Sequence, residues 1–132
     1  MILLAILVGV SALPLGELPP QVLAKGQCAM FLWDRASEKR VAMVLANPLS
    51  LRVVRGTAVT PVPASDAGSG APVLGFRPHL RFADAAGAIA IDATIMPNDG
   101  GIGGVVRDAV ITLTLPSGDA IVAPAAGLVG CG

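Results

Sequence analysis

The chain has few of the residues that catalysis, metal binding and stacking on sugars or bases usually require. Its 132 residues include one histidine, one tryptophan, three phenylalanines and no tyrosine. Side chains that could stack on carbohydrate or on single-stranded nucleic acid are therefore scarce. The nine basic and nine acidic residues cancel, so there is no net charge to attract nucleic acid or an anionic membrane. We expect no nucleic-acid partner.

Motifs for catalysis and cofactor binding are also missing from the sequence. A single histidine excludes a multi-histidine metal site, and any Ser–His–Asp triad has to use His79. Most aspartates fall at predicted turns, where they hydrogen-bond the nearby backbone, and no EF-hand spacing occurs. The glycine-rich stretch 100–104 lacks the spacing of a phosphate-binding loop. We expect no metal or cofactor and no enzymatic activity, with a small hydrolase centred on His79 as the less favoured alternative.

The N-terminal residues have the pattern of an export signal. Residues 2–15 carry no charge, and the run is too short for an ordinary spanning helix of about 20 residues. A signal of this kind ends in small residues at its cleavage site, for which Val22-Leu23-Ala24 after the run is the first choice and Val10-Ser11-Ala12 within the run is the second. No lysine or arginine precedes the run, so an uncleaved N-terminal membrane anchor remains the alternative. We predict a signal peptide or anchor over 1–24, one domain over 25–132, and a periplasmic or secreted location.

Two cysteines, Cys28 and Cys131, lie near opposite ends of the predicted domain. In an oxidising compartment this arrangement predicts one disulfide. Redox pairs are usually close in sequence as C-x-x-C, which disfavours a redox role. The disulfide would close a loop of about 100 residues, for which the chain-entropy estimate is about 4.7 kcal/mol.

Short runs rich in valine, isoleucine and leucine alternate with turn residues, a pattern typical of an all-β domain. The predicted strands cover residues 28–33, 40–45, 49–55, 73–82, 88–95, 104–115, 120–123 and 128–131. Residues 56–72, dense in proline, glycine, serine and threonine, predict a long surface loop. Alternation with period two indicates antiparallel sheet with one buried face. We therefore expect a two-layer sandwich of about eight strands, with a small closed β-barrel as the second choice.

Two groups of side chains are candidates for binding. Arg77, His79 and Arg81 alternate along one predicted strand and so share a face. They form either an anion patch or a charged, solvated edge that prevents aggregation, and Pro78 between them predicts an edge strand. Phe31 and Trp33 point away from Cys28, which gives either an exposed interface or a strand that is buried on both sides.

These observations favour an exported, disulfide-closed β domain that binds a protein partner, as a binding module or an accessory subunit of a cell-envelope assembly. The first alternative is a small-ligand carrier, which would need an internal cavity in a closed barrel. The membrane would be a partner only through an uncleaved N-terminal segment.

Overall fold

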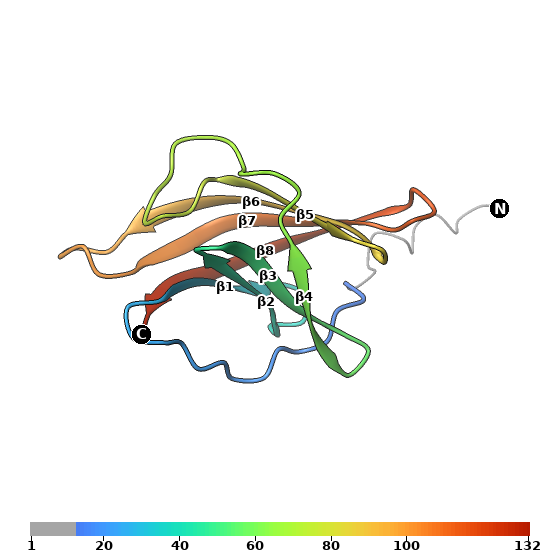
Figure 1. Cartoon of the computed structure of the whole chain (residues 1–132), viewed down its shortest axis with the longest axis horizontal. Helices are drawn as coiled ribbons and strands as arrows, with labels where there is room; N and C mark the ends of the chain where they lie inside the picture. Colours follow the sequence, from blue (N-terminus) through green and yellow to red (C-terminus); the bar gives the residue numbers. More distant parts are fainter. Residues whose placement is uncertain (1–12) are drawn as a thin grey trace.

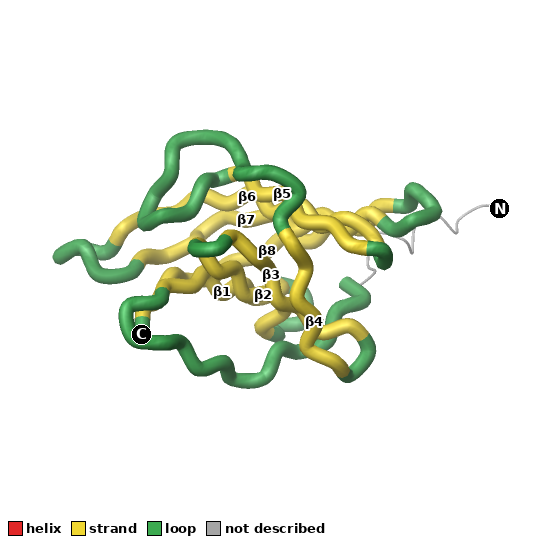
Figure 2. Tube along the Cα trace, viewed as in Figure 1, coloured by secondary structure: helices red, strands yellow, loops and turns green. Residues whose placement is uncertain are grey.

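The computed structural model of the protein describes residues 13–132, and strands are the only regular elements in this range (Figures 1 and 2). The strands are β1 (Cys28–Asp34), β2 (Arg40–Ala46), β3 (Leu49–Arg55), β4 (Ala58–Pro63), β5 (His79–Asp84), β6 (Gly87–Pro97), β7 (Gly104–Thr114) and β8 (Ala120–Cys131). The all-β prediction and the predicted number of strands are confirmed.

The strands form one antiparallel sheet in the order β4-β3-β2-β1-β8-β7-β6-β5. Strands β1–β4 therefore pair in sequence order, as do strands β5–β8, and the first strand also pairs with the last. The two ends of the sheet, β4 and β5, approach one another through a bridge between Ala64 and Phe82. The result is a single, nearly closed, barrel-like sheet, so the barrel describes the fold better than the two-layer sandwich does.

A loop covers the gap between β4 and β5, where the sheet would otherwise present a bare edge. The backbones of Ser69 and His79 exchange two hydrogen bonds, and the amide of Ser65 donates to the carbonyl of Arg81 at 2.8 Å. These bonds occupy backbone groups of β5 that a foreign strand could otherwise use. The position of β5 at the end of the sheet confirms the edge strand that Pro78 predicts.

The structure corrects three of the predicted segments. The strand predicted over residues 73–82 begins only at His79, and residues 73–78 belong to the β4–β5 loop. Residues 56–72 are not loop throughout, because they contain β4, in which Pro61 and Pro63 are exposed. Proline is tolerated there because β4 is an edge strand that donates few ladder hydrogen bonds. Residues 120–123 and 128–131 belong to one strand, β8, which continues through Pro124.

Apolar side chains fill the inside of the sheet. Met30, Leu32, Leu51, Phe76, Leu80, Phe82, Ile89, Ile91 and Ile111 are among those that are less than 2% exposed. Phe76 comes from the β4–β5 loop rather than from a strand, and it belongs to this inner cluster. These buried side chains pack against one another inside the sheet.

The segment before β1 packs against the sheet. Residues 13–27, which we call the N-terminal strap, run along the lower side of the molecule in Figure 1 toward the C-terminus. Leu13 joins the inner cluster. Leu18 lies in a second, outer cluster with Ala29, Met43 and other residues of β1–β3. Residues 1–12 of the predicted leader, including Val10-Ser11-Ala12, lie outside the described residues.

Candidate functional site

The predicted disulfide is present. Cys28 and Cys131 are directly opposite one another in the β1–β8 ladder, and their Cα atoms are 4.0 Å apart. Backbone hydrogen bonds from Gly132 to Gln27 and from Gly26 to Gly132 continue the pairing beyond the bond. The disulfide therefore joins the first strand, β1, to the last strand, β8, within the β1–β8 ladder. A disulfide of this kind is compatible with an oxidising, extracellular compartment.

Phe31 and Trp33 lie on the outer face of β1, and both are half-buried. The guanidinium carbon of Arg40, on β2, is 5.8 Å from the ring centroid of Phe31 and 5.9 Å from that of Trp33. Both distances fall within the range of cation–π contacts. The outer face of β1 is thus partly covered and partly open at these two aromatic side chains.

Phe31 begins a line of apolar side chains that crosses the outer face of the sheet. In the strand register Phe31 is opposite Leu128 on β8, Leu128 is opposite Val105 on β7, and Val105 is opposite Met96 on β6. Leu128, Val105 and Met96 are 43%, 42% and 46% exposed. We call these four residues the outer apolar row. Large apolar side chains gathered on one face are typical of interaction surfaces.

Beyond Phe31, toward β2, the apolar surface that contains the outer apolar row continues beneath the N-terminal strap. Phe31 is opposite Met43 on β2, and Met43 is fully buried. Met43 belongs to the outer cluster that Leu18 covers. The carbonyl of Leu18 also accepts hydrogen bonds from the Arg40 guanidinium, at 3.1 Å and 3.4 Å. The chain itself therefore covers half of this outer surface and leaves the β6–β8 half open.

The structure keeps two residues of the predicted anion patch, His79 and Arg81, together and separates Arg77 from them. His79 Nδ1 lies 2.8 Å from Asp92 Oδ1, and Arg81 donates to the same oxygen at 3.2 Å. Arg77 precedes β5 and donates instead to the carbonyl of Gly70 at 2.8 Å. Asp92 is a neighbour that the sequence interpretation missed, because its position opposite His79 depends on the β5–β6 register. The carboxylate offsets positive charge that the patch would have offered to an anion.

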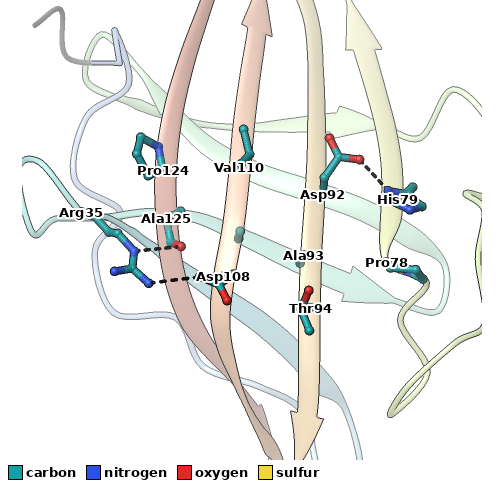
Figure 3. A pocket seen from close by; sticks show the side chains of 11 residues that line it. Arg35, Pro78, His79, Asp92, Ala93, Thr94, Asp108, Val110, Pro124 and Ala125 are labelled. Carbon is teal, nitrogen blue, oxygen red and sulfur yellow. Dashed lines mark hydrogen bonds and ion pairs between the residues drawn. The ribbon is translucent and has the colours of Figure 1, made fainter.

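An open hollow of about 590 Å³ lies between His79 and Arg35 on the outer face (Figure 3). Pro124, Val110, Asp92 and His79 line it, one from each of β8, β7, β6 and β5. At the opposite edge of the hollow, Arg35 donates to the carbonyls of Ala125 and Arg107 and lies 3.9 Å from Asp108. The charged groups at both edges thus already have partners within the chain.

The chemistry available in the hollow is limited. His79 and Asp92 form an imidazole–carboxylate pair of the kind that orients a general base. Ser69 is paired with His79 through backbone hydrogen bonds, but over residues 13–132 its hydroxyl makes no hydrogen bond to the imidazole. Within the same range no group of three or more His, Cys, Asp or Glu side chains could hold a metal ion. A hydrolase would need a nucleophile within hydrogen-bond reach of this imidazole.

Two ionisable side chains with low exposure have roles in the fold. Asp34, 2% exposed, accepts hydrogen bonds from the Ala36 amide and the Ser37 hydroxyl, and so holds the β1–β2 turn. The Arg55 guanidinium lies 3.1 Å from Asp84 at one end of the barrel, although its Nε and this same nitrogen make no aligned hydrogen bond. We take the ion pair as the relevant contact, since close opposite charges attract without good hydrogen-bond geometry.

No helix in the part of the chain that the structure describes has the length and apolar character needed to cross a membrane. Comparisons with protein-family models, with curated proteins and with solved structures found no match to this chain.

Proposed function

We propose that this protein is an exported β domain that binds a protein partner in the periplasm or outside the cell, as a binding module or an accessory subunit of an envelope assembly. The observation that carries the proposal is the outer apolar row. Its β6–β8 members, Met96, Val105 and Leu128, expose more than two-fifths of their surface. Burying such side chains against a partner is favourable by up to about 1.5–3 kcal/mol for a fully exposed residue.

The N-terminal strap indicates what kind of occupant this surface accepts. It is a non-helical, non-strand segment that places Leu18 among Ala29, Met43 and Val54 on the outside of the sheet. The outer apolar row continues this covered surface onto β8, β7 and β6. We therefore expect the partner to lay an extended apolar segment across these three strands, as the strap does across β1–β3.

Export is supported by the disulfide, because such bonds persist in oxidising compartments and are rare in the cytosol. The apolar side chains that gather inside the sheet favour a binding surface on its outside over an internal ligand site. A binding role also agrees with the contacts of Asp92 on β6, whose carboxylate accepts from Arg81 and lies against the His79 imidazole on β5.

The test compares two single substitutions on the outer face of β8. Leu128→Glu places a charge in the outer apolar row, and Val122→Glu places the same charge on the same strand, away from the row, at a side chain that is 61% exposed. Each form is captured from its own cell envelope after crosslinking, and its single tryptophan, Trp33, reports binding of the purified partner by fluorescence. We expect Leu128→Glu to weaken binding by about tenfold or more and Val122→Glu to leave it unchanged.

Equal capture of the same partner by all three forms would remove the outer apolar row as the binding surface. Recovery of the wild-type protein alone and monomeric would contradict a partner-binding function, whereas a crosslinked pair of identical chains would identify a second copy as the occupant. The intact mass of the captured chain reports the disulfide at the same time, because its formation removes two hydrogens.

A further inference from the structure

We infer that the part of the outer face beneath the N-terminal strap is a peptide-binding groove, and that an extended partner segment with a leucine followed by prolines takes the place of the strap there. The inference deepens the proposed function, on which it rests for the existence of a partner. Within the chain the strap occupies the groove, and so shows what the groove recognises. The groove would be empty in a chain that begins at Lys25, so the inference does not depend on whether a leader is removed.

The groove binds the backbone of the strap at two points. The amide of Gly16 donates to the carbonyl of Val54 on β3 at 2.9 Å, and the amide of Leu18 donates to the carbonyl of Arg40 on β2 at 2.7 Å. Arg40 completes the second contact, because its guanidinium donates to the carbonyl of Leu18 at 3.1 Å and 3.4 Å. Main-chain hydrogen bonds of this kind supply affinity for an extended peptide.

Side-chain contacts give the groove its selectivity. Leu18 is 1% exposed and is buried in the outer cluster. Arg52 on β3 donates to the side-chain oxygen of Gln21 at 3.1 Å. A Cβ at Gly16 would lie only 2.8 Å from a methyl group of Val54, so a larger residue there would clash with β3. The preferred ligand therefore has a glycine two residues before the leucine and an amide side chain three residues after it.

The strap is held as a bound peptide rather than as a further strand of the sheet. Pro14, Pro19 and Pro20 have no amide hydrogen to give to a ladder, and Val22 is 94% exposed. The hydrogen bonds of the strap are separate from the ladders that join β1, β2 and β3, so its release leaves these ladders paired. Proline also keeps a segment extended, which lowers the entropy that the segment loses when it binds.

The groove is continuous with the outer apolar row, which identifies a partner as the occupant. Phe31, the residue of the row on β1, packs against the outer cluster. Its ring centroid also lies 5.8 Å from the guanidinium carbon of Arg40, which binds the strap. A partner segment that follows the row from β6 to β1 therefore reaches the strap at Phe31, and it extends onto β2 and β3 only by replacing the strap.

The test uses the full chain with Leu18→Glu, which places a charge in the outer cluster and so releases the strap, and a synthetic peptide with the wild-type sequence of residues 13–24. Trp33 fluorescence reports binding, because the Trp33 ring centroid lies 5.9 Å from the guanidinium carbon of Arg40. A strap that docks within its own chain has an effective concentration of about millimolar, so the peptide should bind with a dissociation constant below about 1 mM. Peptides with Leu18→Ala or Gly16→Val should bind about tenfold more weakly or worse.

The matched control is the full chain with Val22→Glu, which places the same charge at an exposed position of the strap and leaves the strap docked. This chain and the wild-type chain should bind the peptide about tenfold more weakly than the Leu18→Glu chain, because their own strap competes. A folded Leu18→Glu chain that binds no peptide, or that binds the altered peptides equally well, would overturn the inference. Capture of a partner through the outer apolar row would remain a separate measurement, so the two proposals fail independently.

Hydrogen exchange of the wild-type chain decides the question if the Leu18→Glu chain does not fold. The amides of Gly16 and Leu18 should exchange through local release of the strap, before the amides of the β1–β8 ladder. Exchange of both sets together would mean that the strap is inseparable from the fold, and would overturn the inference. A wild-type dimer that excess peptide dissociates would overturn the choice of a partner and identify a second copy of the chain as the occupant.

Discussion

Replacing Cys28 and Cys131 together by serine should destabilise the protein by a large and calculable amount. The two cysteines are 103 positions apart, and the chain-entropy estimate for a closed loop of about 100 residues is about 4.7 kcal/mol at 25 °C. The effect acts on the unfolded chain, which the disulfide keeps from separating its ends. For a domain with a net stability on the order of 5–15 kcal/mol, this is a third or more of the total at the middle of that range.

Urea titration followed by Trp33 fluorescence measures the change. With a slope of about 2 kcal/mol per molar, typical of a small protein, the midpoint should fall by roughly 2 M. The slope should also rise, because an unfolded chain without the crosslink exposes more surface. The native β1–β8 pairing should persist in the variant, since seven residue pairs join these strands. A loss below about 1 kcal/mol with an unchanged slope would refute the view that the bond acts by closing the long loop.

The remaining predictions test the strap, the β1–β8 seam and the hollow. Leu18→Ala should lower the free energy of unfolding by about 2–5 kcal/mol, because it opens a cavity on the outer face of the sheet. Val22→Ala, at a side chain that is 94% exposed, should lower it by less than about 0.5 kcal/mol. Equal urea midpoints for the two variants would mean that the strap does not stabilise the fold. Gly127→Ala should lower the free energy of unfolding by about 1–3 kcal/mol or more, because a Cβ there would overlap a backbone carbonyl of β1. Gly130→Ala is the control, since a Cβ at Gly130 would meet only a leucine methyl at 3.7 Å. Thermal unfolding compares the two variants, and a Gly127 variant of unchanged stability would contradict the tight approach of the strands. His79→Ala should change the free energy of unfolding by less than about 1 kcal/mol, since the contact of His79 with Asp92 is exposed. It should also leave partner capture unchanged. If the wild-type protein has a measurable hydrolytic activity and the variant loses it, that result would instead favour the hydrolase alternative.

The sequence predicts which segments become strands better than it predicts how the sheet curves. Alternation of apolar and polar residues reports that one face of each strand is buried, and a sandwich and a barrel satisfy that condition equally. The choice depends on β1 pairing with β8, a contact between residues about as far apart as the chain allows. β4 escaped prediction because Pro61 and Pro63 are read as loop formers, although an edge strand accepts them.

The candidate site was predictable in its parts and not in its assembly. Period-two alternation correctly placed Phe31 and Trp33 on the face opposite Met30. The continuation of that face through Leu128, however, depends on the register of β8, which no local pattern gives. The strap was harder still, because apolar residues after an uncharged run resemble a leader until their contacts with the sheet are known.

The position of the disulfide divides the chain in an unexpected way. Strands β1–β4 and β5–β8 are two consecutive meanders of four strands, and they meet at the β1–β8 ladder and at the loop between Pro63 and His79. A protease that nicks this exposed loop would therefore cut the chain near its middle without releasing either half, because Cys28 and Cys131 lie in different halves.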